Sequence, residues 1–267
     1  MTRIRQDQPF AYGYNPITTM DETEQNTMMD FGILRLAKDQ VEVNTEQKER
    51  AYLLVQGEVS FEWEGNKETA QRKSCFDENP WVLHVPQGVE VKITGLAETE
   101  LCVTKTTNDR SFPSKLYTAE ECVSEERGKG TMRETSTRIV RTAFDHSNAS
   151  YSNLVVGEVI DFPGKWSSYP PHYHPQPEIY FYKFNPENGY GFCELGEEVV
   201  KLKNNDTVKI LDNVTHPQTT APGYAMYYVW IIRHLDGNPY ISPTFVPEHL
   251  WVTEPDAKIW PDKGNLL

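Results

Sequence analysis

Short apolar runs separated by Gly, Pro and Asn recur along almost the whole chain. Such runs are typical of β-strands, because strand side chains alternate between two faces. Helical periodicity is weak, and only Ala119–Arg127 has a modest helical pattern. Many short strands at regular spacing predict an all-β fold, either a sandwich or a barrel. The predicted strands are Ala51–Glu64, Trp81–Pro86, Val89–Thr94, Glu100–Thr106, Ser136–Phe144, Asn153–Phe162, Glu178–Phe184, Gly191–Leu195, Val199–Leu202, Thr207–Leu211 and Ala225–Arg233.

The strand pattern occurs in two series. A polar, charged segment at Glu120–Thr137 separates them, and 267 residues allow one large domain or two small ones. Asp77–Gly88 and Asn204–Asn213 share a polar turn, a short β run and a second turn. This echo predicts a duplicated β-barrel, with an amino-terminal unit at 1–125 and a carboxy-terminal unit at 126–267. Within the first unit, Gln87-Gly88 predicts a hairpin turn.

Charge and cysteine content restrict the function classes. The net charge is −13 and no dense Lys/Arg run occurs, which argues against nucleic acid and anionic membrane surfaces as partners. Met1–Met20 lacks the apolar core of a signal peptide, and the run Met226–Ile232 is too short to span a bilayer. The four scattered cysteines are expected to be reduced and mostly buried. A cytoplasmic location is therefore expected.

One segment carries candidate metal ligands. His172, His174 and Glu178 share parity, so on an extended backbone their side chains point to the same side. Prolines around them disfavour a helix. With the distant His216 they could converge on one divalent ion, leaving a position for water or substrate. Zinc is the first expectation, and manganese, iron and nickel also suit these ligands. The first unit has only a solitary His84 in its matching region.

The order of these ligands resembles the cupin superfamily, in which a histidine pair, a glutamate and a distant histidine meet inside a jelly-roll barrel. The resemblance implies two cupin domains, a bicupin, with the metal in the second. Asn205 stands where glycine is common, and Leu211-Asp212-Asn213 replaces the usual Pro-x-Gly turn. Asn213 still suits a left-handed turn, so the geometry before His216 can survive.

Longer segments resemble one family more closely, the 5-deoxy-glucuronate isomerases of inositol catabolism. The N-terminal half resembles it more loosely, through Arg72–Gly88. Lys183 departs from it where arginine is expected, and the loop from His174 to Glu178 is shortened. The similar segments are Val156–Val159, Trp166–His172, Glu178–Pro186, Ala221–Trp230 and Glu248–Val252.

The resemblance implies a reaction. It converts 5-deoxy-glucuronate to 2-deoxy-5-keto-gluconate, an aldose–ketose isomerisation through an enediol. A divalent ion would stabilise the negative oxygen and orient the substrate. A general base must also reach the C2 proton.

The sequence leaves the general base open. Tyr180 and Tyr182 share parity with Glu178 and should point into the barrel, and Tyr182 is our first candidate as catalytic partner. Glu178 acting as the base, or a metal-bound hydroxide, are the alternatives. Gln218, Tyr228 and Tyr180 are predicted to contact substrate, although packing explains the aromatic residues equally well.

The substrate carboxylate needs a cation or several donors. Arg141 and Arg233 lie on predicted strands and are the candidates. Lys183 has the opposite parity to the ligands and is expected to face away from them. The remaining histidines receive no functional assignment.

Three other readings stay open. A related enzyme could isomerise the 4-deoxy-5-keto-uronate from pectin breakdown. Histidines and a carboxylate also bind Fe(II) in dioxygenases. A non-enzymatic, sugar-binding bicupin is the third. Exposed aromatic residues and the N-terminal extension leave a homo-oligomer open.

Overall fold

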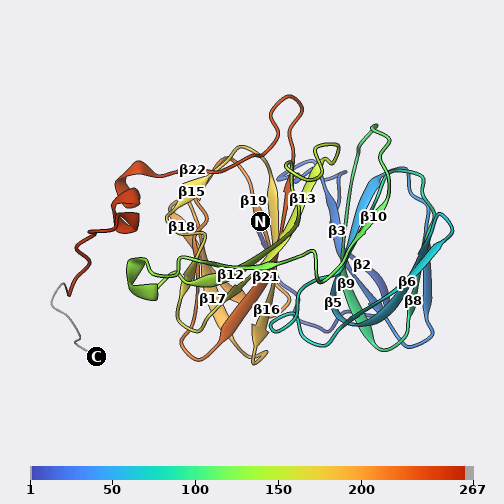
Figure 1. Cartoon of the computed structure of the whole chain (residues 1–267), viewed down its shortest axis with the longest axis horizontal. Coiled ribbons are helices and arrows are strands. Elements are labelled where there is room, and N and C mark those ends of the chain that lie inside the picture. The colour runs from blue at the N-terminus through green and yellow to red at the C-terminus, as the bar shows by residue number, and fades with distance from the viewer. Residues whose placement is uncertain (1, 262–267) are drawn as a thin grey trace.

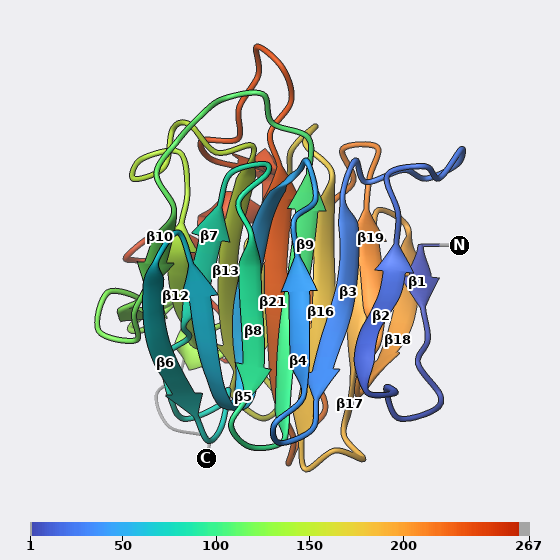
Figure 2. The ribbon, with the colours of Figure 1, turned by 90° about the vertical axis from the view of Figure 1, so that its right-hand side faces the viewer.

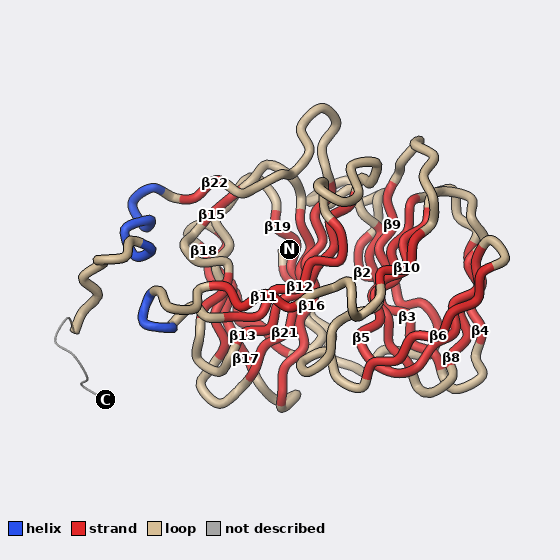
Figure 3. Tube along the Cα trace, in the orientation of Figure 1, coloured by secondary structure: helices blue, strands red, loops and turns tan. Residues whose placement is uncertain are grey.

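The computed structural model describes residues 2–261. Strands form two barrels side by side, one blue to cyan and the other yellow-green to red (Figure 1). In the described residues, helical geometry is confined to two 3-10 segments, η1 (Met132–Glu134) and η2 (Pro247–Thr253) (Figure 3). Neither has the length or apolar character needed to cross a membrane. The predicted all-β fold is confirmed.

The first half of the chain forms the amino-terminal barrel, which faces the viewer in Figure 2. Its long strand β5 (Glu49–Trp63) pairs with β7 and β9 in its first half and with β6 and β8 in its second. A register shift between Leu54 and Gln56 marks the bend. Gly57 follows with a φ of 108°, and a Cβ there would lie 2.4 Å from the carbonyl oxygen of Glu98. Only glycine fits this corner.

The other strands of this barrel are β2 (Gly13–Thr18), β3 (Asp30–Leu36), β4 (Val41–Asn44), β6 (Asn66–Arg72), β7 (Val82–Val85), β8 (Val91–Gly95), β9 (Thr99–Thr106) and β10 (Lys115–Tyr117). β7 pairs with β5 and β10, whereas β8 pairs with β4 and β5. The predicted hairpin at Gln87-Gly88 is therefore wrong. The turn carries the chain from one side of the barrel to the other, and this cannot be inferred from the turn residues themselves.

The carboxy-terminal barrel is built from a seven-stranded and a four-stranded sheet. The seven-stranded sheet contains, in spatial order, β1 (Arg3–Ile4), β19 (Thr207–Ile210), β16 (Glu178–Asn185), β21 (Ala225–Arg233), β13 (Leu154–Asp161), β12 (Arg138–Phe144) and β11 (Ser124–Arg127). The four-stranded sheet contains β14 (Trp166–Ser167), β20 (Gln218–Thr220), β17 (Tyr190–Leu195) and β18 (Glu198–Lys203). A separate ladder joins β15 (His172–Tyr173) to β22 (Thr244–Phe245).

The ends of the two units interlock. β1 pairs with β19, and Arg5 bonds to Asp206 at 2.9 Å, so the first residues of the chain belong to the carboxy-terminal barrel. Figure 2 shows β1 beside the orange strands. β11 spans the predicted division between 1–125 and 126–267, which stays a prediction. The helical pattern at Ala119–Arg127 is overridden, because residues 124–127 pair with β12.

The two barrels share a hydrophobic core between their facing sheets. Phe31 and Leu53 come from the amino-terminal barrel, and Phe181 and Val229 come from the other. The rings of Phe31 and Phe181 lie 5.9 Å apart. Each barrel also has its own interior cluster. All four cysteines are free and buried, as predicted.

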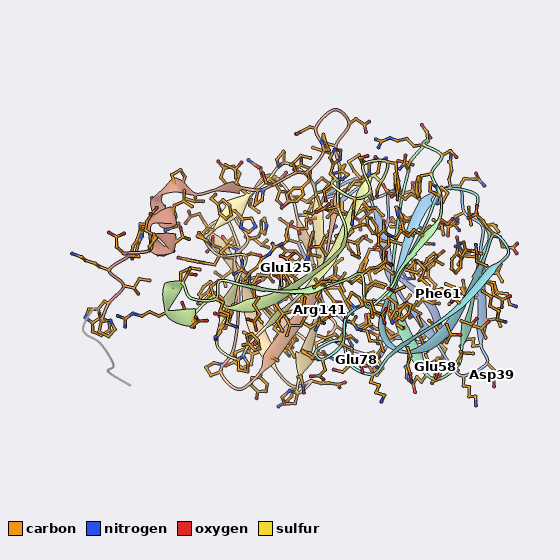
Figure 4. The ribbon with its side chains drawn as sticks, in the orientation of Figure 1. Asp39, Glu58, Phe61, Glu78, Glu125 and Arg141 are labelled. Carbon is orange, nitrogen blue, oxygen red and sulfur yellow. The ribbon has the colours of Figure 1, made fainter. Side chains whose placement is uncertain are left out.

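A buried ion network also joins the barrels. Glu158 of β13 accepts hydrogen bonds from Arg72 at 2.5 Å and Arg141 at 2.9 Å. Tyr227 donates a third hydrogen bond to the same carboxylate at 2.7 Å. Figure 4 shows Arg141 at this junction, near Glu78, whose carbonyl oxygen accepts a hydrogen bond from it. The outward face of β13 is thus committed to the contact between barrels, and the inward face is left for the pocket.

Candidate metal centre and pocket

Three of the four predicted ligands meet inside the carboxy-terminal barrel. One ligand atom from each of His174, Glu178 and His216 lies within 4.8 Å of the other two. Nε2 of His174 is 3.1 Å from Oε2 of Glu178, and Nε2 of His216 is 3.5 Å from the same oxygen. All three side chains are buried. Among residues 2–261, this is the one group of three or more His, Cys, Asp or Glu side chains whose ligand atoms lie close enough together to hold a metal ion.

Local backbone structure explains how separate segments deliver these ligands. Glu178 is the first residue of β16 and points inward, with Tyr180 following on the same face. Asp212 and Asn213 both adopt left-handed conformations with φ of 59°, and they turn the chain from β19 toward His216. The expectation for Asn213 is confirmed. Asn205, at the position where glycine was anticipated, also has a positive φ of 67°.

Each histidine is oriented through its other ring nitrogen. Nδ1 of His174 donates to the carbonyl oxygen of Gln176 at 3.0 Å, and Nδ1 of His216 donates to that of Val214 at 2.9 Å. A carbonyl oxygen can only accept, so the proton must lie on Nδ1. Nε2 then carries the lone pair that a metal ion requires.

The residues fit a cation on two further grounds. Nε2 of His216 is buried and has no hydrogen-bond partner. Burial lowers the pKa of His216 to about 4, so its ring is neutral at neutral pH and can act as a ligand. The carboxylate of Glu178 is buried against the imidazoles of His174 and His216, and a buried charge needs a compensating partner. A divalent cation would supply it.

His172 lies at the edge of this cluster. Its ring is 4.9 Å from that of His216, and its Nδ1 donates to the carbonyl oxygen of Pro170 at 3.2 Å. Burial lowers its pKa to about 4. His172 is not among the three residues whose ligand atoms lie within 4.8 Å of one another. As a fourth ligand it stays a prediction. Like His174 and His216, it is oriented by a hydrogen bond from Nδ1 to a backbone carbonyl oxygen.

A pocket of about 280 Å³ opens onto the cluster. His172, His174 and Glu178 form part of its wall, and Tyr180, Tyr228 and Trp230 form an aromatic part. Arg127 and Arg138 are the cations among its lining residues. The segment before η2 contributes Tyr240, Pro243 and Phe245 to the lining. The arrangement can hold a small anionic molecule against a cation.

A family model described as the KduI/IolB family matches residues 4–252. The chain belongs to the KduI/IolB family. Its relatives include the 5-deoxy-glucuronate isomerase of Geobacillus kaustophilus, 28% identical over 245 residues, covering 84% of this chain and 85% of that protein. The enzyme of the same name from Geobacillus thermodenitrificans is 26% identical and covers 90% of this chain and 92% of its own length. The resemblance drawn from the sequence is confirmed.

Solved structures show the same fold. An IolB-like protein from Salmonella typhimurium aligns with a TM-score of 0.84 at 23% identity, covering 94% of this chain and 99% of that one. The oxalate decarboxylase of Lactobacillus farciminis aligns with a TM-score of 0.68 at 10% identity, covering 95% and 91%. The predicted bicupin fold is confirmed, and in this KduI/IolB protein the His174–Glu178–His216 cluster lies in the carboxy-terminal barrel.

Two residues predicted for catalysis or substrate binding lie deeper than the pocket. The hydroxyl of Tyr182 donates to Oε1 of Gln218 at 2.6 Å, and both residues are fully buried. Neither is among the pocket-lining residues, whereas Tyr180 and Tyr228 are. Tyr182 and Gln218 therefore support the floor of the site, and their proposed contact with substrate stays a prediction.

The two predicted carboxylate-binding arginines lie elsewhere in the KduI/IolB fold. Arg141 points out of the barrel to Glu158. Arg233 donates to Oγ1 of Thr106 at 2.8 Å, on the side facing the amino-terminal barrel. Both have the parity opposite to the inward residues of their strands. Lys183 faces the same junction and bonds to Glu100 at 2.5 Å, which confirms that it points away from the ligands.

The sequence reasoning missed several pocket residues. Arg138 is part-buried and lines the pocket, and the strand pairing places it opposite Asp161. Ser167 and Ser168 line it as well. Parity on the strand Ser136–Phe144 could have separated Arg138 from Arg141, because they differ by three positions and so face opposite sides. The inward position of the serines depends on a positive φ at Ser168, for which the sequence gives no signal.

Proposed function

We propose that this KduI/IolB protein is a divalent-metal-dependent 5-deoxy-glucuronate isomerase, which forms 2-deoxy-5-keto-gluconate. The observation that carries the proposal is the buried His174–Glu178–His216 cluster at the wall of a pocket of about 280 Å³. The names of its relatives supply the substrate. Because all four cysteines are unpaired, we place the reaction in the cytoplasm.

His174, Glu178 and His216 would hold the ion, with His172 as the fourth candidate. Zinc is our first candidate, and manganese, iron or nickel suit the same nitrogen and oxygen donors. When bound, the ion supplies a Lewis acid that stabilises negative charge on the substrate oxygens. The protein orients the imidazoles of His174 and His216 through their Nδ1 hydrogen bonds.

The isomerisation moves protons without net change. The C2 proton leaves, O1 gains a proton, C1 gains a proton and O2 loses one. Glu178, Tyr182 or a hydroxide remains the candidate for the base at C2. Tyr180 and Tyr228 present phenol groups at the pocket wall, where they can contact the substrate oxygens.

Arg138 is our candidate for the substrate carboxylate. It lines the pocket and is part-buried, so a charge-assisted bond there is weakly screened. Its Nη1 donates to the carbonyl oxygen of Ser136 at 2.8 Å, which anchors the guanidinium. Arg127 also lines the pocket but is exposed and bonded to Glu125.

The test is proton NMR of the purified protein with 5-deoxy-glucuronate in deuterated water, after reconstitution with each candidate ion. We expect the ketose product, deuterium at C1 or C2, and no oxygen consumption. Oxygen uptake with Fe(II) would indicate a dioxygenase instead. Sugar binding that survives chelation without any turnover would indicate a binding protein. Turnover of 4-deoxy-5-keto-uronate alone would move the substrate assignment to that sugar.

A further inference from the structure

A second buried carboxyl group lies inside the carboxy-terminal barrel, apart from the metal cluster. Asp161 is the last residue of β13, and its side chain is fully buried. It pairs across the sheet with Arg138 on one side and Met226 on the other. Directly paired residues share a face, and Arg138 lines the pocket while Met226 belongs to the barrel interior. Asp161 therefore points inward.

Neither oxygen of Asp161 has a partner at full hydrogen-bonding geometry. Burial raises the pKa of this carboxyl well above its ordinary value, while Arg138 and the hydroxyl of Ser167 oppose the shift. Unpartnered buried carboxyl groups are rare, because their desolvation costs stability. The contrast with Glu158 on the outward face of the same strand is clear, since three side chains bond to that carboxylate.

A hydrogen-bonded pair of hydroxyl groups lies at the pocket, on the face of the sheet to which Asp161 points. Oγ of Ser167 lies 2.5 Å from the hydroxyl oxygen of Tyr228. Ser167 and Tyr228 both line the pocket. Tyr228 pairs with Val159, which lies two positions before Asp161 on the inward face of β13, so Tyr228 is a diagonal neighbour of Asp161 on that face. Ser168 has a left-handed conformation with φ of 53°, so two consecutive serines can both face inward. Oγ of Ser168 lies 3.5 Å from the hydroxyl of Tyr180.

We propose that Tyr228 is the residue that exchanges a proton with the substrate oxygens, and that Asp161 positions and recharges it through Ser167. The proposal rests on the isomerase function proposed above. In the resting enzyme Asp161 carries the proton and is neutral.

The proton balance closes over one turnover. As the base removes the C2 proton, Tyr228 donates its hydroxyl proton to O1, Ser167 passes its own proton to Tyr228, and Asp161 passes its proton to Ser167. The negative charge then resides on Asp161, beside the guanidinium of Arg138 rather than on a buried phenolate. When C1 is protonated, O2 returns its proton to Tyr228 and the chain runs backward to Asp161.

This arrangement explains why the charge should not remain on Tyr228. Burial raises the pKa of that phenol, so its phenolate is disfavoured inside the barrel. Arg138 favours the charged form of Asp161, which makes the carboxyl the better place for a transient charge. If the Asp161 carboxyl group had only a structural role, we would expect it to have a permanent hydrogen-bond partner.

The test compares Asp161→Asn with Asp206→Asn in the metal-loaded, full-length protein. Asp206 is also fully buried in the same barrel, but it bonds to Arg5 away from the pocket. We expect Asp161→Asn to lower kcat by about 100-fold, the lower end of a general acid–base contribution, with KM unchanged. Asp206→Asn should lower stability and leave kcat per folded molecule unchanged.

Two further measurements keep the test decisive. Infrared difference spectra at neutral pH should show a protonated carboxyl band in the wild type that is absent from Asp161→Asn and present in Asp206→Asn. Ser167→Ala, which tests the chain even if Asp161→Asn does not fold, should also lower kcat. Combining Ser167→Ala with Tyr228→Phe should cost no more than Tyr228→Phe alone, because both break one chain.

The possible failures are distinguishable. A wild-type protein that does not isomerise the sugar overturns the proposed function, and the relay with it. An active wild type whose Asp161→Asn and Ser167→Ala variants keep normal kcat overturns the relay alone. Absence of the carboxyl band from the wild type also overturns it, whatever the kinetics.

Discussion

The two barrels share an architecture but differ in what fills them. Aliphatic and aromatic residues such as Leu54, Phe61 and Trp63 pack the amino-terminal barrel, whose cavity is about 100 Å³. The carboxy-terminal barrel contains tyrosines and a His–Glu cluster around a pocket of about 280 Å³. Both barrels have the same fold, so the difference depends on the inward-facing residues of β13, β16 and β21 in the carboxy-terminal barrel.

The two barrels also differ in the bonding partners of their buried charged side chains. In the amino-terminal barrel, Lys105 bonds to Glu46, and His84 bonds to Glu49 at 2.7 Å. In the carboxy-terminal barrel, neither Glu178 nor Asp161 has a hydrogen-bonded lysine or arginine. Glu49 also accepts hydrogen bonds from Asn108, Ser152 and the backbone N–H of Asn153, whereas Glu178 is contacted by His174 and His216 and neither oxygen of Asp161 has a partner. The carboxyl groups to which we propose a function are therefore those with few or no hydrogen-bond donors around them.

The largest expected effect comes from removing a ligand. His174→Ala should weaken metal binding by more than about 100-fold, beyond the range for loss of an outer hydrogen bond, and reduce activity to background. The barrel should stay folded, because its apolar core surrounds the cluster. The matched variant His84→Gln in the other barrel should cost stability but keep the metal. Elemental analysis of both proteins checks this, and metal retained by His174→Ala would contradict it.

The amino-terminal barrel should respond in stability only. Phe61 lies in the interior of that barrel (Figure 4) and is fully buried. Phe61→Ala should lower the free energy of unfolding by about 3–5 kcal/mol, with kcat per folded molecule unchanged. Phe192→Ala, at a half-exposed residue of the four-stranded sheet, should change it by less than about 0.5 kcal/mol. Urea unfolding measures both, and a loss of kcat in Phe61→Ala would break the comparison.

Acid should lower the stability of the protein through His234, a buried histidine that forms no ion pair with a carboxylate among residues 2–261. Burial chiefly lowers the pKa of His234 to about 4 from 6.5, so the unfolded chain binds the proton more tightly. Stability is therefore full above pH 6.5 and falls by up to about 3 kcal/mol as pH drops toward 4. The charged or titratable groups that act on it are His146, Glu49, Arg233 and Arg110.

His234→Gln should flatten this part of the pH profile of unfolding free energy, measured on metal-free protein. The Glu49 carboxyl contributes at lower pH, because its pKa is lowered by His84 against the effect of burial. Its stabilisation is lost as pH falls below the ordinary value of about 4.5. A His234→Gln profile that is as steep as the wild type between pH 6.5 and 4 would show that this histidine is not the source.

The smallest effect concerns substrate capture. Arg138→Ala should lower kcat/KM roughly 10- to 100-fold. KM should rise because one charge-assisted bond to the substrate is lost, and kcat should fall because the charged form of Asp161 loses a favourable neighbour. Arg127→Ala is the control at the pocket mouth, where exposure weakens the contribution of a charge. Steady-state kinetics at two salt concentrations measures both. A larger loss in Arg127→Ala would reassign the carboxylate contact.

Much of the fold could be read from local patterns. Period-2 alternation correctly placed Tyr180 and Tyr182 on one face, and the left-handed turn at Asn213 was anticipated from its side chain. Which strands pair with one another could not be predicted from alternation or from turn residues. The short edge strands of the amino-terminal half also carry weak patterns, because the exposed residues of β4 and β6 need not be apolar.

The sequence predicted that His174, Glu178 and His216 lie close together, but it did not predict all of the residues around them. The spacing of His174 and Glu178 is local, whereas the position of Arg138 depends on the pairing of β12 with β13. Arg233 could have been excluded by its parity relative to Tyr228. Asp161 could not have been found, because its significance lies in the hydrogen bonds that it does not make.

The most direct test of the account is anomalous diffraction from crystals of the metal-loaded protein. One ion should lie within coordinating distance of Nε2 of His174, Nε2 of His216 and the carboxylate of Glu178. An ion bound elsewhere at full occupancy, with these three side chains unoccupied, would contradict the assignment of the carboxy-terminal barrel as the metal-dependent active site.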